Sequence, residues 1–178
     1  MTHKQFKNSF LLLPLSKALN EANSIRKVRA KLKKFSCPIN ADLESFLHAK
    51  AITFEQNLRS RAYLYIDIST KEVAAYFSIA IHFLDTDGIS KDDTKIIPCY
   101  LIGQLGKSDA YTSMKFGKYI LSDAVAIIDR LNDAIGGRFI ILDSVNQEKV
   151  ISFYQENLFS TIELESHNES IKMIKPYY

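Results

Sequence analysis

Between residues 103 and 121 the chain reads Gly103-Gln-Leu-Gly-Lys-Ser-Asp-Ala-Tyr-Thr-Ser-Met-Lys-Phe-Gly-Lys-Tyr-Ile-Leu121. The start of this stretch closes a predicted strand, Pro98–Leu105, and its last apolar residues begin a pattern typical of a helix. The polar segment between them is a loop that enters a helix N-terminus. Such a terminus offers unpaired backbone N–H groups and the positive end of the helix dipole, which suit a pyrophosphate, and Lys115 and Lys118 add positive charge. Many strand-to-helix turns share these features, so a purely structural turn remains an alternative at this point.

Downstream of this stretch, helix and strand patterns alternate. Apolar residues at helical spacing predict a helix that ends at Gly136-Gly137, a pair suited to a left-handed cap; these residues are Ile120, Leu121, Ala124, Val125, Ile128 and Leu131. Phe139–Leu142 is a short continuous apolar run, typical of a buried parallel strand. Ser144 and Gln147 fit a capping box for the next helix, and Ile171–Ile174 predicts a last strand.

Upstream of it, the patterns predict helices and antiparallel strands. In chain order they are a strand at Phe10–Leu15, a basic helix at Leu19–Lys34, a helix capped by Asn40 or Asp42 that weakens near Asn57, strands at Ala62–Ile68 and Ala75–Phe83 joined near Ser69–Glu72, and an exposed loop at Asp85–Lys95. Antiparallel strands followed by a strand-helix-strand-helix-strand run predict an α/β (α+β) fold around one mixed central sheet. No repeat or flexible linker divides residues 1–178, so we expect a single domain.

The composition is that of an ordinary globular protein. The 178 residues are 47% hydrophobic and 24% charged, which excludes disordered and collagen-like classes. No stretch approaches the ~20 apolar residues of a membrane span or forms a secretory signal, so we expect a cytoplasmic protein without a membrane partner. Cys37 and Cys99 lack metal-site spacing and are expected to be reduced. Asp85, Asp87, Asp92 and Asp93 lack the EF-hand pattern, so no metal is expected.

Positive charge is concentrated near the N-terminus. Residues 1–50 carry ten Lys/Arg against three Asp/Glu, a net of +7, whereas the rest carry thirteen against seventeen, a net of −4. Most of the excess lies in one predicted amphipathic helix, on Arg26, Lys27, Arg29, Lys31, Lys33 and Lys34. This cationic face is either an ordinary solvated helix surface or a contact for the phosphate backbone of a nucleic acid.

Three segments resemble the GNAT superfamily of acetyl-CoA-dependent N-acetyltransferases. The resemblance is nearest to the toxin-like branch that acetylates the amino group of aminoacyl-tRNA. Phe35-Ser-Cys-Pro-Ile-Asn-Ala-Asp-Leu-Glu-Ser-Phe-Leu47 is similar to that branch's F-x-C-G-x-x-x-L-D-x-F-L start, and Tyr100–Leu121 is similar to its cofactor segment. Gly136-Gly-Arg-Phe-Ile-Ile-Leu-Asp143 and Phe153-Tyr-Gln-Glu-Asn-Leu-Phe159 are similar to its last strand, helix and F-Y-x-x-x-G-F ending. Together these segments span most of residues 35–160.

The chain departs from the family pattern in three segments. Where the superfamily has Q/R-x-x-G-x-G/A for the pyrophosphate, this chain has Thr112-Ser-Met-Lys-Phe-Gly117 and keeps only the last glycine. Lys115 stands at a glycine whose missing side chain normally lets the backbone reach the phosphates, and its charge is an expected compensation. Leu158 and Pro38 replace two further glycines, in changes expected to be structurally tolerated.

The resemblance implies roles for particular residues. The backbone of Leu105, Gly106 and Lys107 would hold the pantetheine arm of acetyl-CoA. The pyrophosphate would lie on Lys115, Phe116, Gly117 and Lys118, and Asn146 would contact the cofactor arm. Tyr154 matches the family tyrosine that donates a proton to the departing CoA thiolate; from spacing alone it would be interpreted as a core aromatic residue.

The acceptor follows less directly from the residues. The predicted strand after Pro98 offers no carboxylate as general base, whereas an α-amine with a pKa near 8 is already partly neutral. An aminoacyl ester is therefore a suitable acceptor, with Arg26, Lys27, Arg29, Lys33 and Lys34 as its nucleic-acid contacts. The resemblance also implies an antitoxin partner and a homodimer. Two alternatives stay open: acetylation of a small-molecule or protein amine, and a GNAT-fold binding protein that has lost catalysis.

Overall fold

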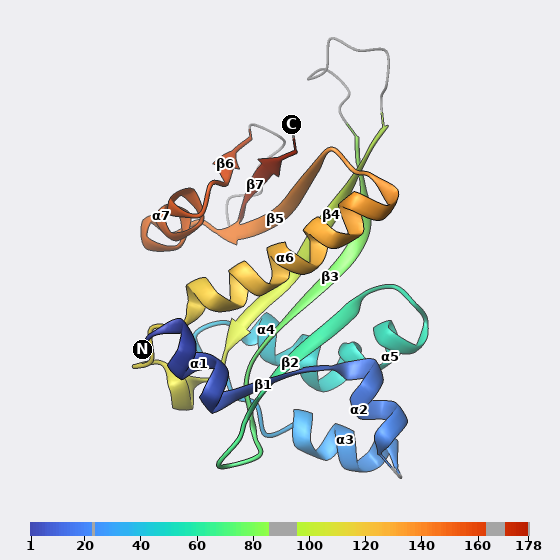
Figure 1. The fold of residues 1–178 in the computed structure, drawn as a ribbon, viewed down its shortest axis with the longest axis vertical. Coiled ribbons are helices and arrows are strands. Elements are labelled where there is room, and N and C mark those ends of the chain that lie inside the picture. The colour runs from blue at the N-terminus through green and yellow to red at the C-terminus, as the bar shows by residue number, and fades with distance from the viewer. Residues whose placement is uncertain (23, 86–95, 163–169, 178) are drawn as a thin grey trace. The chain divides into compact units, whose positions relative to one another are not determined.

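The computed structural model describes residues 1–22, 24–85, 96–162 and 170–177 (Figure 1). Its strands are β1 (Phe10–Pro14), β2 (Arg61–Asp67), β3 (Val73–Asp85), β4 (Ile96–Lys107), β5 (Phe139–Val145), β6 (Ser160–Thr161) and β7 (Ser170–Pro176). Its helices are α1 (His3–Ser9), α2 (Leu15–Glu21), α3 (Ile25–Leu32), α4 (Ala41–Ser45), the π-helical turn η1 (Phe46–Lys50), α5 (Ala51–Gln56), the 3-10 turn η2 (Asp109–Tyr111), α6 (Gly117–Ile135) and α7 (Glu148–Glu156).

The strands form a mixed sheet in the order β1-β2-β3-β4-β5-β7-β6, which confirms the predicted fold class. The chain divides into two compact units, Met1–Ile79 with Gln104–Ala124 and Ala80–Gly103 with Val125–Tyr178. The divisions fall inside β3, β4 and α6, so neither unit is a continuous segment of the chain. The single domain expected for residues 1–178 stays a prediction.

The first unit begins with a helix that the sequence patterns did not predict. Thr2 caps α1 by accepting a hydrogen bond from the Gln5 backbone, while the Gln5 side chain accepts one from the Thr2 backbone. Phe6 is the only buried residue of this helix, and one buried side chain in seven residues leaves no recognisable period. The predicted strand Phe10–Leu15 is confirmed as β1, since only Leu15 passes to the next helix.

The single basic helix predicted at Leu19–Lys34 is wrong, because the chain forms two helices there. The backbone is extended at Ala22, with φ −80° and ψ 130°, and α2 ends at Glu21. Ser24 then caps α3, its hydroxyl accepting a hydrogen bond from the Arg26 N–H. A serine hydroxyl competes for the backbone in this way, and the apolar spacing alone did not reveal it.

The helix predicted after Asn40 is confirmed. The Asn40 side chain accepts from the Asp42 and Leu43 N–H groups, and α4, η1 and α5 run on to Gln56. These helices cover the core of the first unit, whose buried members include Leu15, Leu32, Phe35, Phe46, Leu47, Ile52, Leu64 and Tyr76.

Strands β2 and β3 form the predicted antiparallel hairpin. Along β3 the sequence places Ala75, Phe77, Ile79, Ile81 and Phe83 on one face, in alternation with Tyr76, Ser78, Ala80 and His82 on the other. This pattern predicts one buried face, and the prediction fails at both ends of the strand. All residues from Val73 to Ile79 are buried. Tyr76 packs on Phe35 and Phe46, while Phe77, on the opposite face, stacks on Tyr63, so both faces are covered. Farther along, the side chains of Ile81 and Phe83 are 65% and 61% exposed, although the pattern predicted a buried face.

The chain from β4 to β7 follows the predicted strand-helix-strand-helix-strand order. β5 pairs in parallel with β4, Tyr100 opposite Ile140, and antiparallel with β7. Gly136 closes α6 in the left-handed region, at φ 76°, as the glycine pair predicted. A Cβ on Gly137 would lie 2.5 Å from the Tyr100 ring, which explains the second glycine.

The predicted capping box at Ser144 and Gln147 is wrong. Ser144 is a buried residue of β5, and its hydroxyl donates to the Val145 carbonyl. Gln147 is the residue before α7, and no side chain caps that helix. Burial of the serine in the sheet therefore removes the cap that the sequence spacing offered. Within the described part of the chain, none of the helices is long and apolar enough to cross a membrane.

The C-terminus of α7 is closed by a left-handed turn at Leu158. The Phe159 N–H donates to the Tyr154 carbonyl and the Leu158 N–H to the Gln155 carbonyl, a Schellman arrangement. Leu158 has a φ of 69°, a conformation that costs a side-chain-bearing residue about 1–2 kcal/mol relative to glycine. The family glycine at this position therefore has a backbone role, and leucine is accommodated with strain.

We expect Leu158→Gly to stabilise the protein. Relief of the left-handed strain, less the conformational entropy that glycine loses on folding, leaves a gain of about 0.5–1 kcal/mol. For a chain of this length that corresponds to a melting temperature higher by about 1–4 °C, measured by thermal denaturation. Leu158→Ala is the control, because it removes the exposed side chain but keeps the strain. An equal gain in both variants would contradict the explanation.

Candidate functional site

The end of β4 supplies the residues expected to hold a pantetheine arm. In the described residues the β4–β5 pairs are Tyr100–Ile140 and Leu101–Ile141, so the strand beyond them carries no β5 partner. Gly106 is buried, and a Cβ there would lie 3.0 Å from Leu43 Cδ1 and 3.4 Å from Tyr76 Cε1. The glycine thus lets α4 pack closely on this end of the strand, while Leu105 and Lys107 are half-buried.

The loop that follows β4 is fixed to the first unit by its backbone. The Ser108 N–H donates to the Ala74 carbonyl and the Asp109 N–H to the Ser36 carbonyl, both at 2.9 Å. Phe116, at the far end of the loop, is completely buried, with its ring centroid 5.2 Å from that of Phe6 and 5.0 Å from that of Phe10. Of the predicted cofactor residues, Phe116 can therefore contribute only backbone groups.

Free backbone donors gather where the loop enters α6. The N–H groups of Lys115, Gly117 and Lys118 donate to no group of the residues that the structure describes. The side chains of Lys115 and Lys118 are exposed on either side of the buried Phe116. Unpaired N–H groups at a helix start, flanked by two ammonium groups, form a site suited to an anion.

The ammonium group of Lys107 lies inside this loop. Its Nζ donates to the Met114 carbonyl at 2.7 Å and the Thr112 carbonyl at 3.1 Å, and it lies 5.2 Å from the centre of the Phe116 ring. Burial lowers the pKa of Lys107. The family resemblance implies only a backbone role for this residue, and no spacing in the sequence marks its side chain.

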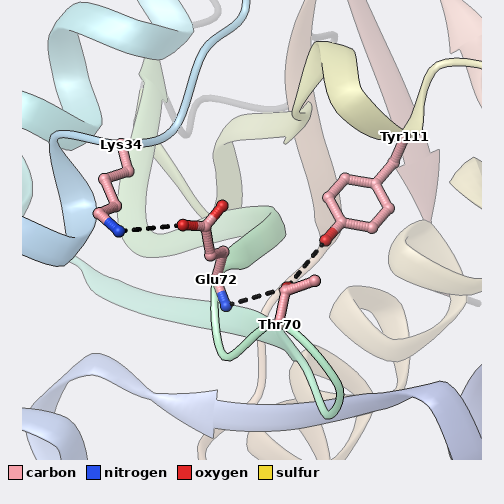
Figure 2. A network of polar contacts seen from close by, with 4 residues as sticks. All are labelled: Lys34, Thr70, Glu72 and Tyr111. Atoms are coloured by element: carbon pink, nitrogen blue, oxygen red, sulfur yellow. Dashed lines mark hydrogen bonds and ion pairs between the residues drawn. The ribbon is translucent and has the colours of Figure 1, made fainter.

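A second polar network joins the loop to the turn between β2 and β3 (Figure 2). The Tyr111 hydroxyl donates to Asp67 Oδ2 at 2.9 Å, so the Thr70 hydroxyl, 3.4 Å away, is left to donate to the Tyr111 oxygen. The Glu72 N–H donates to Thr70 Oγ1 at 3.3 Å, and the Glu72 carboxylate lies 3.0 Å from Lys34 Nζ (Figure 2). Tyr111 and Asp67 are 44 positions apart in the sequence, which gives no signal of their contact.

The basic helix α3 presents a cationic surface. Ile25, Val28 and Leu32 are spaced as one apolar face of a helix. Val28 and Leu32 are buried, whereas Ile25 is 44% exposed. Five cations of this segment are exposed and have no ion-pair partner among the described residues; they are Arg26, Lys27, Arg29, Lys31 and Lys33. Lys34 differs from them, since Glu72 neutralises it. Of the nucleic-acid contacts predicted from the sequence, Lys34 is therefore the one already engaged within the protein.

The remaining predicted site residues belong to the second unit. Tyr154 lies on α7 and is buried, its ring 5.1 Å from Phe153 and 5.9 Å from Phe159. Burial raises the pKa of Tyr154 to about 12, and its hydroxyl bonds to none of the described residues. Asn146 is exposed between β5 and α7. The cofactor loop belongs to the first unit, so the structure describes the two parts of the predicted site separately.

No metal centre is evident in the described part of the chain. Its His, Cys, Asp and Glu side chains form no group of three or more that could hold an ion. Asp87, Asp92 and Asp93 lie outside the described residues. Cys37 and Cys99 are buried free thiols, as expected, and burial raises the pKa of both.

No protein-family model and no curated protein matches the sequence. Solved structures do match. A mutant AtaT toxin bound to the C-terminus of the antitoxin AtaR and acetyl-CoA has a TM-score of 0.72 at 18% identity, over 94% of this chain and 93% of that chain. AtaT complexed with acetyl-methionyl-tRNAfMet has a TM-score of 0.73 at 18% identity, over 94% of each chain. The KacTA–DNA complex has a TM-score of 0.67 at 14% identity, over 94% and 92%.

This chain has a GNAT-like fold. The fold implied by the sequence resemblance is thereby confirmed. At such low identity the likeness concerns the fold alone, so the residue roles rest on the geometry of this chain. Among the features described, the unpaired N–H groups where the loop after β4 enters α6 are those best suited to bind a ligand.

The carboxylate of Asp67 makes the Tyr111 network sensitive to pH. Partial burial raises its pKa, but hydrogen bonds from Ser69, Tyr111 and Thr70 outweigh that effect and bring the pKa below the ordinary value of 3.8. A carboxyl group with a lowered pKa in the folded state stabilises the protein fully above about pH 4 and loses this contribution as the pH falls through the lowered pKa.

We therefore expect Asp67→Asn to reduce stability at pH 7 by about 1 kcal/mol, because Tyr111 loses its charged acceptor. The difference from the unsubstituted protein should shrink as the pH falls below about 4, measured by urea denaturation across pH. Asp133→Asn, on an exposed residue of α6, is the control and should show no such change. A difference that is constant across pH would exclude the charge of Asp67 as the cause.

Proposed function

We propose that this protein is an N-acetyltransferase that transfers the acetyl group of acetyl-CoA to a primary amine, the amino group of an aminoacyl-tRNA. The observation that carries the proposal is the set of unpaired N–H groups at Lys115, Gly117 and Lys118, in a fold shared over nearly the whole chain with toxins bound to acetyl-CoA or to acetylated tRNA. The site's chemistry fits the pyrophosphate, and the neighbours suggest the rest of the ligand.

The residues present fit acetyl-CoA as cosubstrate. The backbone of Leu105, Gly106 and Lys107 lies beyond the last β4–β5 pair and would accept the amide-bearing pantetheine arm as an added strand does. The pyrophosphate would lie on the N–H groups from Lys115 to Lys118. Lys115 is not among the residues with positive φ, so lysine meets no backbone strain where the family pattern has glycine. Asn146 stays a proposed contact of the cofactor arm.

The proposed reaction is direct attack by the amine. The amine nitrogen attacks the thioester carbonyl carbon, a C–N bond forms and the C–S bond breaks. The nitrogen, cationic after attack, releases one proton to solvent, which restores the donor afterwards, and the departing thiolate receives a proton. Tyr154 would supply that proton, since a phenol with a pKa of about 12 is fully protonated at neutral pH. In a water-excluded site the thiolate is also more basic than in water, which brings the two groups closer in proton affinity.

An aminoacyl-tRNA is favoured as acceptor by the cationic surface of α3. Five cations within eight positions, without an ion-pair partner among the described residues, suit a phosphate backbone, and an α-amine needs little help from a general base. In this proposal the protein is a cytoplasmic toxin, neutralised by an antitoxin, and forms a homodimer. AtaT is bound to the antitoxin AtaR in one matching structure, which supports an antitoxin partner by analogy, whereas the homodimer and the cytoplasmic location stay proposals.

Acetylation of a small-molecule or protein amine is the second candidate among enzymes, because α3 is also compatible with a plain solvated surface. A GNAT-fold binding protein without catalysis is the third, motivated by the departures from the family pattern between Thr112 and Lys115. If the acceptor is a small-molecule or protein amine, activity should not depend on the cations of α3. If the protein is a binding protein, no amine should be turned over.

We expect Tyr154→Phe to lower kcat by roughly 10²–10⁴-fold while acetyl-CoA binding persists, because the variant keeps the buried ring and loses only the proton donor. Binding is measured by thermal shift, where ligand at 100 times its Kd adds about 2.7 kcal/mol, or about 5–11 °C. Tyr177→Phe, which loses a hydroxyl bonded to Asp129, is the control. Equal loss of activity in both variants would contradict the role of Tyr154. Absence of a shift in the unsubstituted protein would favour the binding-protein alternative.

Neutralising α3 tests the nucleic-acid acceptor. A triple variant, Arg26→Gln, Lys27→Gln and Arg29→Gln, should weaken tRNA binding and reduce the slope of log K against log salt by about 2–3, because each lost phosphate contact contributes roughly 0.7–0.9. The matched control has the same charge change at Lys4, Lys7 and Lys17, all exposed and outside α3. An unchanged slope in the α3 variant, measured by filter binding, would contradict the tRNA assignment and favour another amine.

A further inference from the structure

We infer that the side chain of Lys107 is a positioning residue for the anion-binding loop, which it holds so that backbone N–H groups face the cosubstrate phosphates. This inference rests on the proposed function for the identity of the ligand. It assigns to Lys107 a side-chain role in a position where the sequence indicated only backbone contacts.

The ammonium group binds two carbonyls of one short loop. Its distances are 2.7 Å to the Met114 oxygen and 3.1 Å to the Thr112 oxygen, so a single Nζ joins both sides of the turn that precedes α6. Hydrogen bonds from a charged donor are about twice as strong as neutral ones, and lysine has three donors of which these bonds use two. The Met114 oxygen also accepts the Phe116 N–H at 3.0 Å, which closes the turn from within.

Holding the Met114 carbonyl also orients the next N–H group. The Met114–Lys115 peptide is trans, and in a trans peptide the carbonyl and the N–H point to opposite sides of the chain. With the Met114 oxygen directed at Lys107, the Lys115 N–H must point away from the ammonium. The same reasoning applies to Thr112 and the Ser113 N–H. Lys107 thus sets the direction of two N–H donors while it touches neither.

This arrangement bears on the missing family glycines. A flexible loop would pay an ordering cost on binding, and a loop already held in one arrangement avoids it. Phe116 fixes the end of the loop by burial, but burial is not directional and leaves the peptide planes free to rotate. The bonds from Lys107 supply the direction, and the ammonium lies 5.2 Å over the Phe116 ring, so the two anchors are adjacent.

The test is Lys107→Met, which keeps the length and apolar stem of the side chain and removes its donors. In the free protein, hydrogen exchange at the Met114 and Phe116 amides should accelerate by about fivefold or more, since both close the turn that Lys107 holds. Binding of acetyl-CoA, measured by calorimetry, should weaken roughly tenfold, whereas acetylpantetheine, which has no pyrophosphate, should bind equally to both proteins. Lys107→Arg should restore part of the difference, because the guanidinium keeps two donors.

Lys17→Met is the matched control, since Lys17 is an exposed lysine of α2 in the same unit. It should change neither exchange in the loop nor binding. Unchanged exchange in Lys107→Met would overturn the inference, whatever the cosubstrate proves to be. Equal weakening for acetyl-CoA and acetylpantetheine would also overturn it, because the loss would then be general. If the unsubstituted protein binds no acetyl-CoA, the proposed function fails, and the exchange result alone decides the role of Lys107 in the loop.

Discussion

The burial of Phe116 against Phe6 and Phe10 fixes the place where α6 begins. Phe116 is fully buried, and Gly117 is the first residue of the helix, so the position of this ring sets the position of the helix N-terminus. Phe6 is the one buried residue of α1, so the contact of α1 with the core is made by the ring that packs on Phe116. The first nine residues are therefore part of the foundation of the candidate site, although they lie far from it in the sequence.

Hydrogen bonds fix the parts of the loop between β4 and α6 that apolar packing does not hold. Tyr111 ties the middle of the loop to Asp67, and backbone bonds from Ser108 and Asp109 tie its start to the strand and the segment beneath it. Among the described residues the N–H groups of Lys115, Gly117 and Lys118 stay unpaired, and the side chains of Lys115 and Lys118 are exposed. The suitability of this surface for an anion thus follows from how the loop is held within the first unit.

The parts of the fold that the sequence predicted are those with strong local patterns. α6 has six apolar residues at helical spacing and a glycine pair at its end, and β5 begins with a short apolar run, so both elements were found. α6 ends where the glycine pair predicts, whereas β5 runs three residues past the predicted end at Leu142. The predictions failed where tertiary packing overrides the local pattern. β3 is covered on both faces at its start, and Ser144, although spaced as a cap, is buried in β5.

The candidate site was predictable to a similar degree and for similar reasons. The loop and the start of α6 follow from the change of pattern after Gly103, and the cationic face of α3 follows from charge alone. No local sequence pattern predicts two of the contacts, Tyr111 with Asp67 and the Lys107 side chain with the loop carbonyls. In each case the groups come together only because the backbone folds. Glu72 likewise removes Lys34 from the free cations, a change that only the β2–β3 turn explains.

Lysine at position 115, where the GNAT pattern that the sequence resembles has glycine, has different physical consequences for the backbone and for a ligand. A glycine is indispensable where φ is positive, and the described non-glycine residues in that region are Leu58, Lys71 and Leu158, not Lys115. Leucine at 158 is therefore a strained replacement, whereas lysine at 115 is not. What lysine changes is access, since its side chain occupies space near the N–H groups that glycine would leave open. Its exposed ammonium offsets this by attracting the anion over a longer range than a hydrogen bond reaches. With lysine at position 115, a phosphate group approaches the backbone less closely than it would with glycine but meets an additional positive charge. This substitution favours binding only if the remaining N–H groups are already oriented toward the phosphate.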